Sequence, residues 1–130
     1  MITELTPDSY FDTINEEGPL HVVMYYGATC GPCKMTMPIY EAVVEHFKLY
    51  NIVNVKFHKF HHWENEYRPF IDEHNLKTRG VPTFRYYYMG EVINDDPRSF
   101  TDPNELKQHI MNTTKAIEST MGSFDLYAQS

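Results

Sequence analysis

The apolar positions of this chain follow two different periods, one typical of strands and one typical of helices. Leu20–Tyr26, LHVVMYY, is almost continuously apolar, which predicts a strand covered on both faces of a sheet. Gly90 can supply the positive φ that a hairpin turn needs. The other strands that the pattern predicts are Ile2–Leu5 at a sheet edge, Val53–Phe60, and the two arms of a hairpin, Thr83–Met89 and Glu91–Asn94.

Apolar residues that recur once per helical turn predict the helices. The longest runs from about Pro32 to Tyr50, and Pro38 should bend it because proline removes one backbone hydrogen bond. Its apolar stripe consists of Ile39, Val43, Phe47 and Tyr50. The remaining helices are expected at Thr6 to about Glu17 with Phe11 and Ile14 inward, at Glu64–Asn75, and from Asp102-Pro103 onward with Leu106, Ile110, Ile117 and Met121 buried.

The order of these elements predicts the fold class. A strand–helix–strand unit, then a hairpin and a closing helix, indicates an α/β fold whose sheet has mixed strand direction. No repeat or linker interrupts the pattern, so we expect a single domain over residues 1–130. Residues 122–130 carry no periodic pattern and should form a flexible or loosely packed tail.

The composition narrows the classes of function. Hydrophobic residues make up 42% of the chain and charged residues 22%, as in ordinary globular proteins. The net charge of -7 argues against nucleic acid as a partner, since binders of nucleic acid carry basic patches. The first residues do not resemble a signal peptide, and no apolar run approaches the ~20 residues of a membrane span. We therefore expect a soluble cytoplasmic protein with no membrane partner.

Both cysteines lie in one short motif, Cys30-Gly31-Pro32-Cys33, between a predicted strand and a predicted helix. In a reducing cytosol such a pair is more often catalytic or metal-binding than structural. As a structural crosslink, a disulfide between the two cysteines would close a loop of only about four residues and would join no distant elements. Because the N-terminus of a helix stabilises a thiolate and lowers its pKa, reactive thiols are favoured over inert ones.

A structural zinc site is the alternative interpretation of the two cysteines. Zinc takes four ligands in such sites, and the chain has no further cysteine. Histidines such as His58, His61 and His62 could complete the set, but their spacing matches no common zinc pattern. We expect neither a metal nor another cofactor.

Three stretches make the chain similar to a known family. VVMYYGATCGPCKMTMP around the cysteines, RGVPTF at Arg79–Phe84 and MGEV at Met89–Val92 resemble the thioredoxin family. The resemblance covers nearly the whole chain, and CGPC is the form of the C-x-x-C motif associated with thioredoxins themselves. It implies the thioredoxin fold, with a central mixed β-sheet of about four to five strands flanked by helices. The activity that it implies is thiol–disulfide exchange.

The resemblance also implies a role for each residue of the CGPC motif. Cys30, at an exposed helix tip, would be the nucleophile that attacks a protein disulfide. Cys33 would resolve the mixed disulfide, which leaves a Cys30–Cys33 redox disulfide. Gly31 would permit close approach of a partner backbone, and Pro32 would fix the first helical turn.

Two residues of the second motif are implied to complete the site. Pro82 matches the family's cis-proline, which lies beside the two sulfurs. Without that match an ordinary trans-proline would be favoured, since only ~5% of X-Pro bonds in folded proteins are cis. Val81 would offer backbone hydrogen bonds to an extended substrate segment.

Two positions depart from the family's pattern. Thr29 stands where thioredoxins carry a tryptophan before the first cysteine, so substrate contacts at this position should differ. Met24 stands where they carry a buried aspartate that assists proton transfer, so we expect slow resolution by Cys33. Lys59 matches the lysine partner of that aspartate; the alternative is an ordinary strand lysine with its head in solvent.

Two further segments are unusual. The His-rich stretch 58–62 is followed by an insertion, residues 63–75, which could bind a partner or a metal. A family-specific insertion is the simpler interpretation, because loops are the variable parts of a fold. The run Tyr86–Tyr88 is expected to fill a strand rather than to stack on bases.

The favoured function is a monomeric protein-disulfide reductase that acts on disulfide-containing protein substrates. Its electrons would come from thioredoxin reductase or an equivalent donor. Two alternatives stay open. One is a partner-specific redox protein with a shifted reduction potential. The other is a binding subunit that uses the thioredoxin fold and whose redox activity is incidental.

Overall fold

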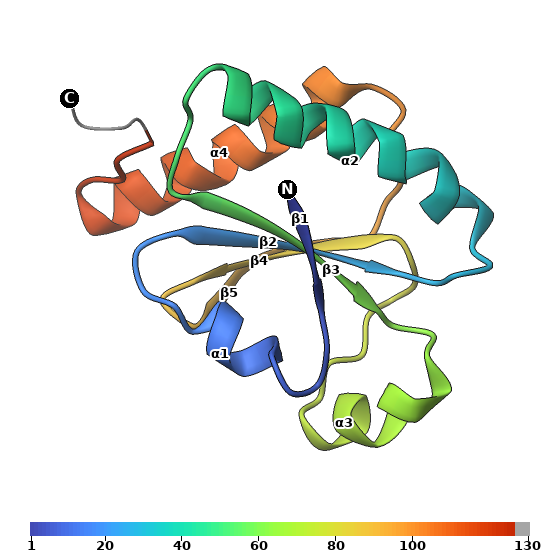
Figure 1. The fold of residues 1–130 in the computed structure, drawn as a ribbon. Helices are drawn as coiled ribbons and strands as arrows, with labels where there is room; N and C mark the ends of the chain where they lie inside the picture. Colours follow the sequence, from blue (N-terminus) through green and yellow to red (C-terminus); the bar gives the residue numbers. More distant parts are fainter. Residues whose placement is uncertain (127–130) are drawn as a thin grey trace.

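A five-stranded sheet forms the centre of the computed structural model, which describes residues 1–126 (Figure 1). Its strand order is β1-β3-β2-β4-β5. The strands are β1 (Ile2–Leu5), β2 (Leu20–Tyr26), β3 (Val55–His61), β4 (Thr83–Tyr88) and β5 (Glu91–Asp96). β1 and β2 both run parallel to β3, whereas β4 is antiparallel to β2 and to β5. The predicted α/β fold with a mixed sheet is confirmed.

Helices cover both faces of this sheet (Figure 1). On one face lie α2 (Gly31–Leu49) and α4 (Pro103–Met121), and on the other lie α1 (Tyr10–Ile14) and α3 (Arg68–Glu73). A 3-10 turn, η1 (Asn65–Tyr67), leads into α3. Each face therefore has its own apolar core, one beneath α2 and α4 and one beneath α1 and α3.

β2 separates the two cores, which explains its nearly unbroken apolar sequence. Val22 and Met24 belong to the core beneath α2 and α4, whereas Val23 and Tyr25 belong to the opposite core. Successive side chains of a strand point to opposite faces, so a strand covered on both sides needs apolar residues throughout. The predicted strand and its double coverage are confirmed.

The predicted hairpin is formed by β4 and β5. Met89 and Gly90 connect the strands, with φ of +55° and +79°. Positive φ at both central residues is typical of the type I′ turn, whose twist matches that of the paired strands. Tyr86 and Tyr87 are buried, one in each core, so the tyrosine run fills the strand as expected.

The first helix is shorter than predicted. Thr6 does not begin it; instead, Thr6 and Ser9 form a turn in which each backbone N–H donates to the other's hydroxyl, at 3.0 and 3.3 Å. Such side-chain bonds compete with helical ones, and α1 begins only at Tyr10. The predicted helix at Glu64–Asn75 is likewise divided, because a 3-10 turn precedes α3.

Two residues assigned to buried stripes are exposed. Tyr50 is 60% exposed and Met121 59% exposed, so both assignments were wrong. Each lies at the C-terminal end of its helix, Tyr50 as the C-cap of α2 and Met121 as the last residue of α4. The start of α4 is as predicted, since Asp102 caps it through a hydrogen bond from the Asn104 N–H at 3.0 Å.

The first part of the predicted tail packs against the domain. The ring of Phe124 lies 5.6 Å from the ring of Tyr88, edge to face. The carbonyl of Leu126 accepts a hydrogen bond from the Val53 N–H at 2.6 Å. The rest of that tail, residues 127–130, lies outside the described residues. Within residues 1–126, none of the helices combines the length and apolarity needed to cross a bilayer.

Candidate active site

The two cysteines lie where β2 ends and α2 begins. The Cys30 N–H donates to the Gly27 carbonyl at 3.1 Å, which closes a turn after the strand. Cys30 is the N-cap of α2, and a disulfide joins it to Cys33, with the two Cα atoms 5.2 Å apart. Pro32 occupies the first turn, where a missing N–H costs no helical hydrogen bond. The expected Cys30–Cys33 disulfide is thus present.

The start of α2 favours negative charge on Cys30. The sulfur of Cys30 accepts the Cys33 N–H at 3.1 Å, in the manner of an N-capping side chain. A helix N-terminus carries unpaired N–H groups and partial positive charge. Once the disulfide is reduced, these groups stabilise a thiolate at Cys30, which is the reactive form of cysteine.

Cys30 is less exposed than expected. In the disulfide form Cys30 is 4% exposed and Cys33 2%. The sulfur of Cys30 lies 3.7 Å from the Val81 carbonyl oxygen, so the loop before β4 covers one side of it. The neighbours Thr29, Gly31 and Pro32 are exposed. A partner must therefore reach the sulfur across these neighbours. The helix tip is exposed as expected, but Cys30 within it is buried.

The loop before β4 brings the second predicted motif beside the first. The Val81–Pro82 peptide bond is cis, the isomer that the resemblance implied. Val81 is half-buried and Pro82 buried. Together with Pro32 and Arg98, these residues line a groove of about 350 Å³. The groove therefore runs from the CGPC motif to the segment that follows β5.

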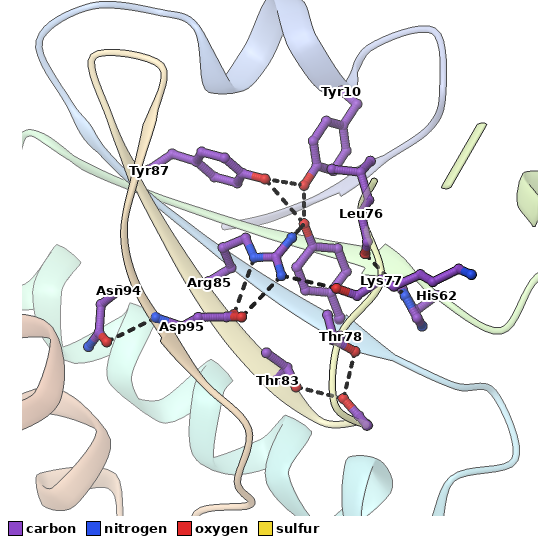
Figure 2. A network of polar contacts seen from close by, with 12 residues as sticks. Tyr10, His62, Leu76, Lys77, Thr78, Thr83, Arg85, Tyr87, Asn94 and Asp95 are labelled. Carbon is purple, nitrogen blue, oxygen red and sulfur yellow. Dashed lines mark hydrogen bonds and ion pairs between the residues drawn. The ribbon is translucent and has the colours of Figure 1, made fainter. Parts of the chain in front are cut away.

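Hydrogen bonds from β4 and from its preceding loop hold this segment in place (Figure 2). The hydroxyls of Thr78 and Thr83 both donate to the Gly80 carbonyl, at 2.9 and 2.6 Å. Their shared acceptor lies directly before Val81. The backbone beside the cysteines is thus fastened by side chains on both flanks.

Arg85, on β4, ties the same loop to the core (Figure 2). Its guanidinium donates to the Lys77 carbonyl at 3.4 Å and to both carboxylate oxygens of Asp95, at 3.1 and 3.2 Å. It also donates to the Tyr25 hydroxyl at 3.3 Å and lies 5.0 Å from the centre of that ring. Sequence reasoning missed Arg85, although an arginine within an apolar strand was an available signal.

Three tyrosine hydroxyls complete this network. The Tyr10 hydroxyl is hydrogen-bonded to that of Tyr25 and to that of Tyr87, the latter at 2.8 Å. Burial, followed by the neighbouring tyrosines, raises the pKa of Tyr10; burial likewise raises that of Tyr25. The three hydroxyls are hydrogen-bond partners of one another, on the face of the sheet opposite to the cysteines.

Met24 and Lys59 occupy the positions where the family pattern has an acid and its lysine. Met24 is fully buried in the same core cluster as both cysteines, so this strand position offers them no carboxylate. Lys59 is its register partner on β3. The Lys59 ammonium lies 3.9 Å from Glu4 and 5.6 Å from the centre of the Tyr26 ring. Lys59 therefore interacts with the β1 edge, and a role at the cysteines stays a prediction.

The His-rich segment is divided between the two faces of the sheet. His58 is buried and stacks on His21, whereas the ring of His61 stacks on Tyr26 with centroids 5.0 Å apart. His61 Nε2 accepts the Ala28 N–H at 3.0 Å, which fixes the loop before Cys30. No group of three or more His, Cys, Asp or Glu within residues 1–126 is arranged to hold a metal ion.

Comparisons with known proteins agree with this geometry. The thioredoxin family model matches residues 1–113. The chloroplastic F-type thioredoxin of Mesembryanthemum crystallinum is 32% identical over 95 residues, which is 72% of this chain and 46% of that protein. The thioredoxin of Mycoplasmoides gallisepticum (strain R(low / passage 15 / clone 2)) is 31% identical over 87 residues, which is 67% of this chain and 77% of that protein. The chain thus spans about half the length of the first relative and about three quarters of the second.

The fold itself also has solved counterparts. A chain from a structure on the thiol-resolving mechanism of yeast mitochondrial 1-Cys peroxiredoxin superposes with a TM-score of 0.63 at 22% identity. The match covers 85% of this chain and 94% of that one, which supports the fold. The family match, the relatives and the cysteine pair at the start of α2 lead to one conclusion: this chain belongs to the thioredoxin family of thiol–disulfide oxidoreductases.

Proposed function

We propose that the protein reduces disulfides of other proteins through Cys30 and Cys33. One observation carries this proposal: Cys30 caps α2, with the Cys33 N–H on its sulfur, and Cys33 lies within bonding reach. The first cysteine is thereby prepared to attack as a thiolate, and the second is prepared to attack the sulfur of the first and release the substrate.

The reaction balances with these two residues alone. The Cys30 thiolate attacks one sulfur of a substrate disulfide; a new S–S bond forms, the substrate bond breaks, and the released substrate thiolate takes a proton from solvent. Cys33 then loses its proton and attacks the sulfur of Cys30. The second substrate thiol leaves, and the Cys30–Cys33 disulfide remains. Two electrons have passed from the protein to the substrate.

The neighbouring residues support this reaction by shaping the approach. Exposed Thr29, Gly31 and Pro32 form the surface that a substrate crosses to reach the covered sulfur. The groove beside Val81 and Pro82 would receive an extended substrate segment, with the Val81 backbone as its hydrogen-bond partner. Met24 supplies no proton acceptor, so Cys33 would lose its proton to water.

The proposal includes the partners and the setting of the protein. Residues 1–130 would act as one monomeric domain in the cytoplasm, without a metal or another cofactor. Regeneration of the dithiol needs two electrons, which thioredoxin reductase or an equivalent dithiol donor would provide. Lys59 would contribute at most indirectly, because its ammonium is engaged with Glu4 and Tyr26.

Reduction of insulin disulfides with dithiothreitol as the electron source tests the proposal. We expect the wild-type protein to accelerate the reaction and Cys30→Ser to abolish the acceleration. Reduced Cys33→Ser, mixed with insulin after removal of the dithiothreitol, should accumulate a mixed disulfide that mass spectrometry detects. A wild-type protein that does not accelerate the reaction would contradict the reductase. If, in addition, a double cysteine-to-serine variant retained its cellular role, a binding subunit would be favoured.

A partner-specific redox protein is the second candidate, favoured by the buried methionine at position 24. The reduction potential of the Cys30–Cys33 pair separates the two. A value near the roughly -270 mV of thioredoxin supports a general reductase. A value near the roughly -180 to -120 mV of isomerases and oxidants supports the specialised protein.

A further inference from the structure

Trp63 lies against the loop that carries the nucleophile. Its indole sits on the backbone of Gly27, where a Cβ would overlap the ring atoms Cε3, Cδ2 and Cζ3. Only glycine leaves room for the ring at this position. The Cys30 N–H bonds to the carbonyl of the same Gly27 at 3.1 Å. The indole thus packs on the first residue of the turn whose last residue, Cys30, carries the reactive sulfur.

Two hydrogen bonds fasten the segment of Trp63 to this loop. The His62 N–H donates to the Tyr26 carbonyl at 2.8 Å, and the Ala28 N–H donates to His61 Nε2 at 3.0 Å. The two residues before Trp63 are therefore bound to the two residues around Gly27. An aromatic side chain held in this way needs little further ordering when it meets a partner.

Trp63 is nevertheless 47% exposed, although its other face rests on Gly27. Ala28 and Thr29, between Gly27 and Cys30, are also exposed, and neither is large enough to cover the indole. An extended chain advances about 3.3 Å per residue. Gly27 precedes Cys30 by three residues, so their Cα atoms are at most about 10 Å apart. A substrate segment that leaves the attacked cysteine across Thr29 covers this distance, and so reaches the indole, within about three residues.

The surroundings of Trp63 are acidic. Glu64 follows it directly, and Glu66 lies in the same turn, η1. The carboxylates of Glu4, Asp8, Glu64 and Glu66 all act on the Tyr67 hydroxyl of that turn and, after its partial burial, raise its pKa. The Lys59 ammonium on the neighbouring strand is already paired with one of them, Glu4, at 3.9 Å. A cationic side chain of a partner meets an aromatic face and acidic neighbours here.

We propose that Trp63 is a specificity-determining residue of the reaction, and that it selects protein disulfides with Lys or Arg within about three residues of the attacked cysteine. The cation lies over the indole and close to Glu64, which orients the disulfide toward Cys30. The inference rests on the proposed reductase function. Trp63, in the insertion after β3, would then provide the aromatic contact surface that Thr29 does not provide.

The test uses three disulfide-linked peptides that are identical except at one position near the cysteine, which is Arg, Leu or Glu. Reduction of each by the reduced protein is followed at low ionic strength. We expect the Arg peptide to react fastest, and Trp63→Ala to slow it by about 3- to 10-fold through a higher KM. The Glu peptide should be unaffected, and Trp63→Phe should retain most of the preference.

Gly27→Ala is the second variant, because its methyl group displaces the indole without removing it. It should lose the same preference for Arg. Tyr50→Ala is the matched control, an exposed aromatic at the far end of α2 whose loss should change no rate. Equal slowing of all three peptides by Trp63→Ala, or none, would overturn the inference. If the wild-type protein reduces none of the peptides, the proposed function itself fails.

Discussion

His21 and His58 face each other inside the protein, with Nδ1 of His21 3.0 Å from Nε2 of His58 and their rings stacked. Both side chains are buried, on the neighbouring strands β2 and β3. The backbone carbonyl of Glu16 bonds the other nitrogen of His21 at 3.1 Å, and the Glu16 carboxylate pairs with Lys56 on the surface. Burial lowers the pKa of His21, and burial followed by the charge of His21 lowers that of His58 to about 4.

The histidine pair predicts loss of stability in mild acid. The unfolded chain binds protons at these histidines near pH 6.5, whereas the folded chain keeps them neutral, so the free energy of unfolding falls as pH decreases below 6.5. For His58 the loss reaches at most about 3 kcal/mol near pH 4. Urea unfolding between about pH 7.5 and 5 measures the part of this loss that occurs above pH 5, outside the range in which Glu16 titrates.

A matched pair of variants separates this effect from general acid sensitivity. His58→Gln should flatten the pH dependence, because it removes one of the two groups. His74→Gln is the matched control, because it changes a histidine outside the buried pair whose side chain is 38% exposed. If the free energy of unfolding changed with pH equally in both variants, the buried pair would not be the cause of the acid sensitivity.

The tyrosine cluster predicts a loss of stability at alkaline pH. The pKa values of Tyr10 and Tyr25 are raised by burial, so the folded protein keeps both hydroxyls protonated where the unfolded chain ionises them. Stability is therefore complete below about pH 10 and is lost as pH rises above it. Near-ultraviolet absorbance should show these tyrosines ionising together with unfolding. Ionisation of all tyrosines before any loss of circular dichroism would contradict this.

Met24→Asp should speed the second half of the reaction and weaken the fold. A carboxylate in this core position can accept the proton of Cys33, and general base catalysis contributes on the order of 100-fold or more. Burying a carboxyl group without a partner should cost about 3 kcal/mol of stability. Rapid-quench mass spectrometry of the mixed disulfide measures the rate, with Met24→Leu as the isosteric control. Unchanged decay in a folded Asp variant would mean that Met24 does not limit resolution.

Asp102→Ala should destabilise the protein through the last helix. The Asp102 carboxylate accepts the Asn104 N–H at 3.0 Å and caps α4, which packs on the same core as the cysteines. Loss of such a cap costs about 1 kcal/mol. Asp102→Asn keeps an accepting oxygen and should remain near the wild-type stability in urea unfolding. If Asn were as damaging as Ala, the negative charge rather than the cap would matter.

Sequence reasoning located the elements well where a local pattern had a single interpretation. β2 has the predicted bounds, Asp102 caps α4, and Gly90 lies in the hairpin turn. It was less accurate where side chains had local alternatives: Thr6 and Ser9 bond each other in a turn and delay α1. Periodicity also extended the stripes to Tyr50 and Met121, because it does not reveal where a helix passes beyond the core.

The site was predicted only in part. The CGPC motif and the family resemblance indicated Cys30, Cys33 and the position of Pro82, since these residues form recognisable local motifs. Nothing local indicated that Val81 would cover the sulfur of Cys30, or that Lys59 would turn toward Glu4. Both depend on strands and loops that meet only after the sheet has formed.

By itself, the sequence determined the alternation of strands and helices, the double coverage of β2 and the chemistry of the cysteine pair. These follow from the period of apolar residues and from side-chain chemistry, which are properties of neighbours along the chain. Only the tertiary structure decided that Trp63 lies on Gly27 and that His21 faces His58. Each of these pairs comes from two segments that β2–β3 pairing brings together, and the register of that pairing is set by the packing of the whole sheet.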